Sequence, residues 1–238
     1  MIESLVLRVV AYGLIPTIAT ILGSALIFLH VSLDERFVDV ALGFGSGLMV
    51  YVAFVELLIP SIELGGLGLS LVGFTIGFIL IKSLDTFVPH ARVVRNAGRR
   101  NLTLMALAIA IHNIPEGLAV GSTSLHSPEA GLATAIAIAI QDVPEGLIVS
   151  LSVATSSGKI LSGFLAGVLS AVSELVSAIA SLVGLIDTAI TLPVLLALSA
   201  SAMVYVVVHE VAPEIFGHEH DEYATLGFIA GLIIGMIL

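Results

Sequence analysis

The chain has no cysteine, which excludes disulfide bonds, thiolate metal sites and thiol catalysis. It also has little charge: charged residues make up 11% of its 238 residues, against 58% hydrophobic ones. A soluble domain of this length carries far more charge. Basic residues are scarce, 8 against 18 acidic ones, so the chain lacks the basic patch that binding of nucleic acid requires. The lipid bilayer is therefore the expected surroundings of the protein.

Long apolar runs separated by short polar breaks predict an all-α integral membrane protein. Each run is near the ~20 residues that cross the hydrocarbon core. We expect about eight transmembrane helices in a single transmembrane domain, residues 1–238, with no separate soluble domain. The expected spans are residues 5–28, 38–60, 69–87, 102–125, 130–153, 161–186, 190–211 and 223–238.

The basic residues predict the orientation of these spans in the membrane. Six lie in loops on one side of the membrane, namely Arg36, Arg92, Arg95, Arg99, Arg100 and Lys159. The opposite side holds only Arg8. Because basic loops stay in the cytoplasm, we expect loop 88–101 to be cytoplasmic and both termini to lie outside a plasma membrane.

Two sequence repeats join spans that cross the membrane in opposite directions. HNIPEGL at 112–118 returns as QDVPEGL at 141–147, an offset of 29 residues (112 to 141) on the next span. A second pair joins 49–56 to 203–210, both beginning Met-Val-Tyr-Val and ending in glutamate. Inverted repeats of this kind are typical of secondary transporters.

Four carboxylates, Glu116, Asp142, Glu145 and Glu174, lie well inside the expected spans. A charged residue at the bilayer centre costs roughly 2.5–3.5 kcal/mol. Four isolated charges would therefore cost on the order of 10 kcal/mol. A bound cation, protonation or a water-filled cavity must offset that cost.

Helical spacing favours the bound cation. His112 and Glu116 are four residues apart and share a helix face, and Asn113 lies three residues from the same glutamate. The equivalent residues at 141–145 repeat this spacing. Facing helices would thus offer two glutamates that can bridge two cations, with ligands that suit a borderline divalent ion. Pro115 and Pro144 predict a kink beside each glutamate, and the glycine that follows each glutamate permits close helix approach.

These motifs resemble the ZIP (Zrt-/Irt-like) metal transporter family over essentially the whole chain. The specific parts are HNIPEG at 112–117, QDVPEG at 141–146, Ser170-x-x-x-Glu174 and His209-Glu210-x-x-Pro213-Glu214. The resemblance implies one metal centre made by His112, Glu116, Gln141 and Glu145. It implies a neighbouring centre made by Asn113, Glu116, Asp142, Glu145 and Glu174.

The resemblance also implies a homodimer that imports zinc, iron, manganese or cadmium by alternating access. The metal is then substrate rather than cofactor, and the protein is not an enzyme. Many members of the family have His-Glu where this chain has Gln141-Asp142. That pair resembles the prokaryotic branch with a two-metal site. Its missing imidazole weakens the case for strict zinc selectivity.

Three residues are candidates for the ion pathway. Glu56 either lines the entrance or sits at the membrane interface, and His209 with Glu210 either forms a release path or ends a helix. The polar loop 218–222 is interpreted as a solvated turn, with metal hand-off as the alternative.

Two other functions remain open from the residues alone. The first is an intramembrane metal-dependent hydrolase, which needs a metal-activated water and a nearby base. The chain has no HExxH motif, and both motif glutamates are assigned as ligands. The second is a passive cation channel, which would differ from a transporter in showing flux without saturation.

Overall fold

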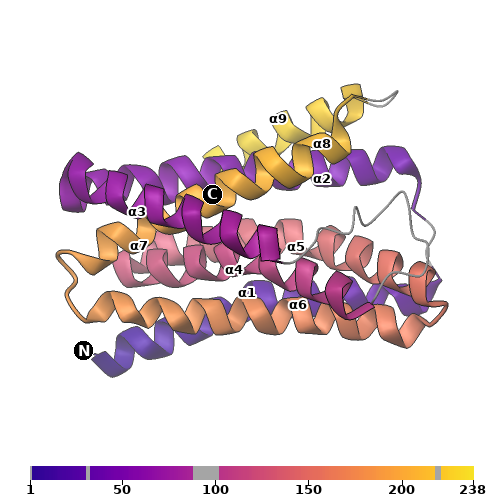
Figure 1. Ribbon diagram of the computed structural model, residues 1–238, viewed down its shortest axis with the longest axis horizontal. Coiled ribbons are helices and arrows are strands. Elements are labelled where there is room, and N and C mark those ends of the chain that lie inside the picture. Colours follow the sequence, from indigo (N-terminus) through magenta and orange to yellow (C-terminus); the bar gives the residue numbers. More distant parts are fainter. Residues whose placement is uncertain (1, 31–32, 88–101, 218–220) are drawn as a thin grey trace.

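The structure, a computed structural model, describes residues 2–30, 33–87, 102–217 and 221–238, with the backbone alone for residues 87 and 102–112. Every element in these ranges is helical, which confirms the all-α prediction (Figure 1). The α-helices are α1 (Ile2–Ala25), α2 (Glu35–Tyr51), α3 (Ile59–Phe87), α4 (Leu102–His126), α5 (Pro128–Ser157), α6 (Ile160–Ala180), α7 (Thr191–Val206), α8 (Ala212–Ile215) and α9 (Asp221–Ile237). Two segments are 3₁₀ helices, η1 (Leu26–Leu29) and η3 (Ser181–Leu185), and two are π-helices, η2 (Val52–Leu58) and η4 (Val207–Val211).

Five stretches of the described residues are long and apolar enough to cross a membrane. One of them, Glu35–Thr86, is 52 residues long and includes the expected span 38–60 and all but the last residue of the expected span 69–87. The expected loop between these spans is instead helical, broken at Gly66 with φ 70° and ψ 170°. Only glycine adopts this conformation readily, so the chain changes direction there without a polar loop. The total of eight spans stays a prediction.

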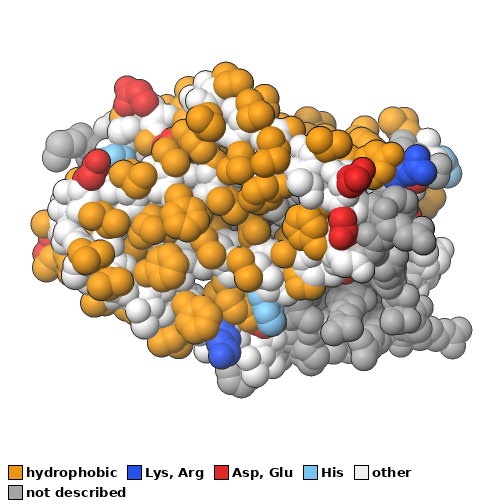
Figure 2. Space-filling model, turned by 90° about the horizontal axis from the view of Figure 1, so that it is seen from above, with side chains coloured by type: hydrophobic (Ala, Val, Ile, Leu, Met, Phe, Trp, Pro, Cys, Tyr) orange, Lys and Arg blue, Asp and Glu red, His pale blue; other side chains and the backbone are white. Residues whose placement is uncertain are grey.

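The outer surface suits contact with lipid. Figure 2 shows a face covered largely by hydrophobic side chains, with acidic and basic groups toward its edges. Large apolar side chains such as Leu67, Leu161 and Leu226 are more than half exposed, at 61%, 60% and 67%. In water such a surface would be costly, whereas in a bilayer it is the expected one.

Helix packing follows the inverted repeat predicted from the sequence. Helix α2 packs on α9 as α3 packs on α7, and α1 packs on α5 as α4 packs on α6. The repeat relates α1 to α6, α2 to α7, α3 to α9 and α4 to α5. Under this relation the contact of α2 with α9 corresponds to that of α7 with α3, and the contact of α1 with α5 corresponds to that of α6 with α4. The two π-helices fall at equivalent places, because η2 begins at residue 52 and η4 at residue 207, close to the 154-residue offset (49 to 203) of the second repeat.

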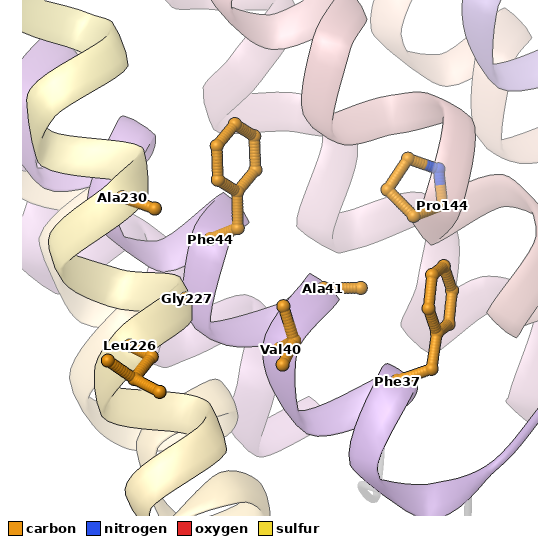
Figure 3. Close-up of a pocket in the computed structure, with 8 residues that line it drawn as sticks. All are labelled: Phe37, Val40, Ala41, Phe44, Pro144, Leu226, Gly227 and Ala230. Atoms are coloured by element: carbon orange, nitrogen blue, oxygen red, sulfur yellow. The ribbon is translucent and has the colours of Figure 1, made fainter.

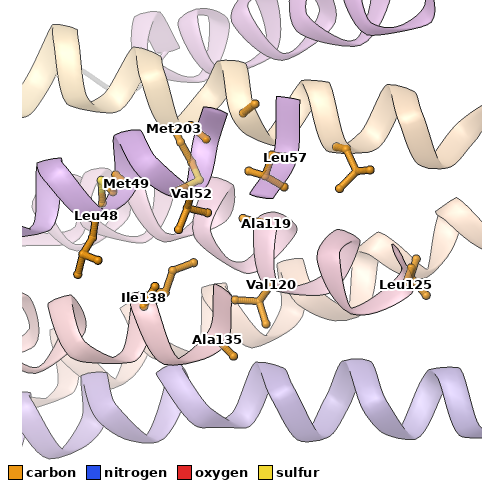
Figure 4. Packing of buried hydrophobic residues seen from close by; sticks show 14 of the residues in the cluster. Leu48, Met49, Val52, Leu57, Ala119, Val120, Leu125, Ala135, Ile138 and Met203 are labelled. Atoms are coloured by element: carbon orange, nitrogen blue, oxygen red, sulfur yellow. The ribbon is translucent and has the colours of Figure 1, made fainter. Parts of the chain in front are cut away.

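A buried apolar cluster fills the space where the repeats meet. It includes Leu48, Val52 and Leu57 from α2 and η2, together with Ile138 of α5 and Met203 of α7 (Figure 4). Among the described side chains, the cluster follows the HNIPEG motif along α4 and precedes the QDVPEG motif along α5. The antiparallel helices therefore place the packed core on one side of both motifs.

The orientation of the chain in the membrane stays a prediction. Loop 88–101, which carries four of the eight Lys and Arg residues, lies outside the described residues, as does segment 218–220 of the polar loop.

Candidate metal centre

The two Pro-Glu-Gly motifs lie on contacting helices at the centre of the bundle. Helices α4 and α5 pack against each other and continue through Pro115 and Pro144. A methyl group on Gly117 would collide with the Glu174 carbonyl oxygen of α6, and one on Gly146 would lie 2.5 Å from the Thr20 carbonyl oxygen of α1. The glycine after each glutamate therefore brings a further helix against the motif, as the sequence predicted.

Three carboxylates converge in this region. One oxygen each of Glu116, Asp142 and Glu145 can be chosen so that all lie within 4.8 Å of one another. Glu116 and Asp142 are buried, each with 1% of its surface exposed. Gln141 donates from Nε2 to Glu116 Oε1 at 2.5 Å, which joins the two motifs directly. The spacing argument from the sequence is thus matched by proximity in space.

A fourth carboxylate, Glu174 of α6, lies beside Asp142. The Thr20 hydroxyl is 3.0 Å from Asp142 Oδ2 and 3.5 Å from Glu174 Oε2. Glu174 is completely buried. Asn113 is also buried, and its Oδ1 accepts a hydrogen bond from the Ser170 hydroxyl at 2.8 Å. Helix α6 therefore contributes to the site through both residues of the Ser170-x-x-x-Glu174 motif.

Several buried oxygens at this site lack a hydrogen-bond donor among the described residues. They are Glu116 Oε2, Gln141 Oε1, Asp142 Oδ1 and Glu174 Oε1. Each unsatisfied buried acceptor costs about 1–3 kcal/mol, and more when it is charged. Metal cations accept lone pairs, so cations bound at this site would satisfy these oxygens. Carboxylate and amide oxygens are suitable ligands for divalent ions of this group.

The remaining candidates lie outside this cluster or cannot be placed. His112 belongs to α4, but its side chain lies outside the described residues. Glu56 is half-buried in η2. In η4, His209 is 59% exposed with Nε2 3.3 Å from Asp85 Oδ2. Its neighbour Glu210 is close enough to Glu145 for their charges to interact.

Sequence reasoning missed two parts of this arrangement. Thr20 was not a candidate, although it lies 154 residues before Glu174, the same offset as the second repeat. Asp85 was not assigned to the ion pathway, yet it accepts a hydrogen bond from the Tyr205 hydroxyl at 2.6 Å and contacts His209. The repeat offset could have identified Thr20, whereas no pattern linked Asp85 to α7.

A separate groove on the molecule does not suit a metal. It has a volume of about 400 Å³ and lies between α2, α5 and α9, with Phe37, Phe44, Pro144 and Leu226 among its lining residues (Figure 3). These side chains carry no metal ligand. The polar cluster described above is therefore the candidate site.

The fold and the site together define a class of protein. A multi-pass helical membrane protein with inverted repeats, and with acidic groups buried where the repeats meet, is built as an ion transporter.

Comparison with known proteins identifies the family. Residues 96–238 match the family described as ZIP Zinc transporter. The zinc transporter ZupT of Chlorobaculum parvum is 32% identical over 93% of this chain and 92% of its own length. ZupT of Nitratidesulfovibrio vulgaris is 34% identical, over 90% of each chain, and zinc transporter ZIPB of Bordetella bronchiseptica is 33% identical over 92% of this chain and 76% of its own length. The chain belongs to the ZIP family of metal transporters, which are not enzymes, and the hydrolase alternative is set aside.

Proposed function

We propose that the chain imports divalent transition-metal ions, chiefly zinc, through a two-metal site on α4, α5 and α6. The observation that carries this proposal is the group of four buried oxygens without a donor among the described residues, all from residues of the two Pro-Glu-Gly segments and Glu174. Zinc is favoured because the relatives are named zinc transporters. Iron, manganese and cadmium are further proposed substrates, because the oxygen ligands suit iron and manganese and the imidazole of His112 suits cadmium.

The charge of the site supports two ions rather than one. Glu116, Asp142, Glu145 and Glu174 carry four negative charges when ionised, which two divalent ions neutralise. We assign His112, Glu116, Gln141 and Glu145 to the first centre. The second takes Asn113, Glu116, Asp142, Glu145 and Glu174. Both glutamates of the repeated motif then bridge the two ions.

Ion movement would follow alternating access around this site. Inverted repeats allow one group of helices to rearrange against the other. Glu56 is proposed to line the entrance, and His209 and Glu210 the release path. Contact of His209 with Asp85, and the proximity of Glu210 to Glu145, support this release path. We also propose a homodimer in the plasma membrane, each copy a single transmembrane domain with both termini outside.

Metal uptake into proteoliposomes tests the proposal. Zinc uptake should saturate, and iron, manganese and cadmium should compete with it. The double variant Glu116→Gln/Glu145→Gln should abolish uptake, because it removes both bridging charges with little change of shape. Glu129→Gln is the matched control, since Glu129 is exposed in the first turn of α5. Flux that rises linearly with metal concentration would indicate a channel instead.

A further inference from the structure

Thr20 of α1 lies among the proposed metal ligands. Its side chain is buried, with 2% of the residue exposed. The hydroxyl is 3.0 Å from Asp142 Oδ2, 3.5 Å from Glu174 Oε2 and 3.0 Å from the Pro16 carbonyl oxygen. A hydroxyl has one hydrogen and two lone pairs, so it can satisfy only one of these three acceptors fully. Two of the three acceptors must then be satisfied in another way.

The inverted repeat gives Thr20 a defined position in the site. It precedes Glu174 by 154 residues, and exchanging α1 with α6 carries one onto the other. The backbone contacts agree with this relation. Gly146 lies against the Thr20 carbonyl oxygen in the same way as Gly117 lies against the Glu174 carbonyl oxygen. Thr20 therefore occupies, on α1, the place that a carboxylate occupies on α6.

We infer that Thr20 is a specificity-determining residue of the second metal centre. It contributes a neutral hydroxyl oxygen from the position that the inverted repeat relates to Glu174. The hydroxyl lies 3.0 Å from both Asp142 Oδ2 and the Pro16 carbonyl oxygen, so it can donate to either. With an ion bound, it donates to the Pro16 carbonyl and turns a lone pair toward the ion. A neutral oxygen adds a ligand without adding a fifth negative charge to the four that two divalent ions balance. This inference rests on the two-centre site proposed above.

An additional oxygen ligand does not favour all metals equally. Manganese suits larger sets of oxygen ligands, whereas zinc and cadmium gain more from the imidazole assigned to the first centre. Thr20 should therefore matter most for manganese. Removal of the hydroxyl should shift the preference of the protein away from manganese and toward cadmium.

Binding of manganese and of cadmium to the purified protein in detergent tests the inference, by calorimetry with each metal alone. Thr20→Val keeps the shape and removes the hydroxyl, and should weaken manganese binding by about tenfold while changing cadmium binding less. Thr20→Ser should restore the parent's manganese affinity. Thr17→Val is the matched control, because the buried Thr17 hydroxyl bonds the Gly13 carbonyl at 2.7 Å on the same helix; it should bind both metals as the parent does.

Three outcomes would overturn the role of Thr20: Thr20→Val binding both metals like the parent, equal losses for both metals, or no rescue by serine. Glu174→Ala in the same assay separates this inference from the proposed function. If Glu174→Ala loses manganese and Thr20→Val does not, only the role of Thr20 fails. If neither variant changes the binding of either metal, the second centre itself is wrong.

Discussion

Adding one methyl group at Gly146 tests how closely α1 must approach the metal site. The methyl carbon of Gly146→Ala would lie 2.5 Å from the Thr20 carbonyl oxygen and 3.1 Å from the Ser24 hydroxyl. An ordinary contact is about 3.5 Å, so α1 and α5 must separate by about 1 Å. Overpacking of this kind costs about 1–3 kcal/mol. The same movement carries Thr20 away from Asp142. The Thr20 hydroxyl oxygen and Asp142 Oδ2 are 3.0 Å apart in the parent protein.

Two measurements on the purified protein follow from this. The thermal unfolding temperature should fall, and the affinity for manganese, the metal for which Thr20 matters most, should weaken by about tenfold or more, because metal sites tolerate only about 0.2 Å in their ligand distances. Gly68→Ala is the control, since nothing lies within 4 Å of a methyl group placed there. Removing a helical glycine should stabilise the control by about 0.5–1 kcal/mol. Unchanged unfolding temperature and affinity in Gly146→Ala would refute the reasoning.

Three further predictions concern ligands, protons and topology. His112→Ala should reduce zinc and cadmium uptake more than manganese uptake in competition assays, because imidazole prefers the softer ions; equal losses would contradict the assignment of His112 to one centre. Metal binding should release protons, since carboxylates and imidazole must be deprotonated to bind, so affinity should fall as pH falls between about 7.5 and 5.5. Calorimetry in two buffers of different ionisation enthalpy measures this release, and identical heats with constant affinity would exclude it. Ala97→Cys introduces the only cysteine of the chain, and an impermeant maleimide should label it in opened but not intact cells; labelling of intact cells would reverse the topology.

The central site could be predicted from the sequence because each of its main parts is local. Glu116 and Glu145 lie in near-identical segments, and helical spacing already places their neighbours on the same face. Their cost inside a membrane marks them as functional. The proximity of Glu116, Asp142 and Glu145 agrees with this reasoning.

The parts that could not be predicted depend on contacts between distant segments. Asp85 meets His209 only because α3 packs on α7, and a lone aspartate near a span end gives no sign of this. Gly66 lies between the expected spans 38–60 and 69–87, but the sequence pattern gives no sign that the chain changes direction there inside a helical stretch. The π-helical form of η2 and η4 also has no signal in local hydropathy.

The two π-helices have a mechanical consequence. A π-turn holds one residue more than an α-turn, and each residue of an α-helix advances the chain by about 100° and 1.5 Å. If the extra residue shifts along the helix, each side chain in the shifted stretch rotates by about 100° about the helix axis. The backbone stays hydrogen-bonded during this shift. Glu56 lies in η2 and Glu210 in η4, at corresponding points of helices that run in opposite directions. One kind of local slip can thus turn either acidic side chain without unfolding any helix.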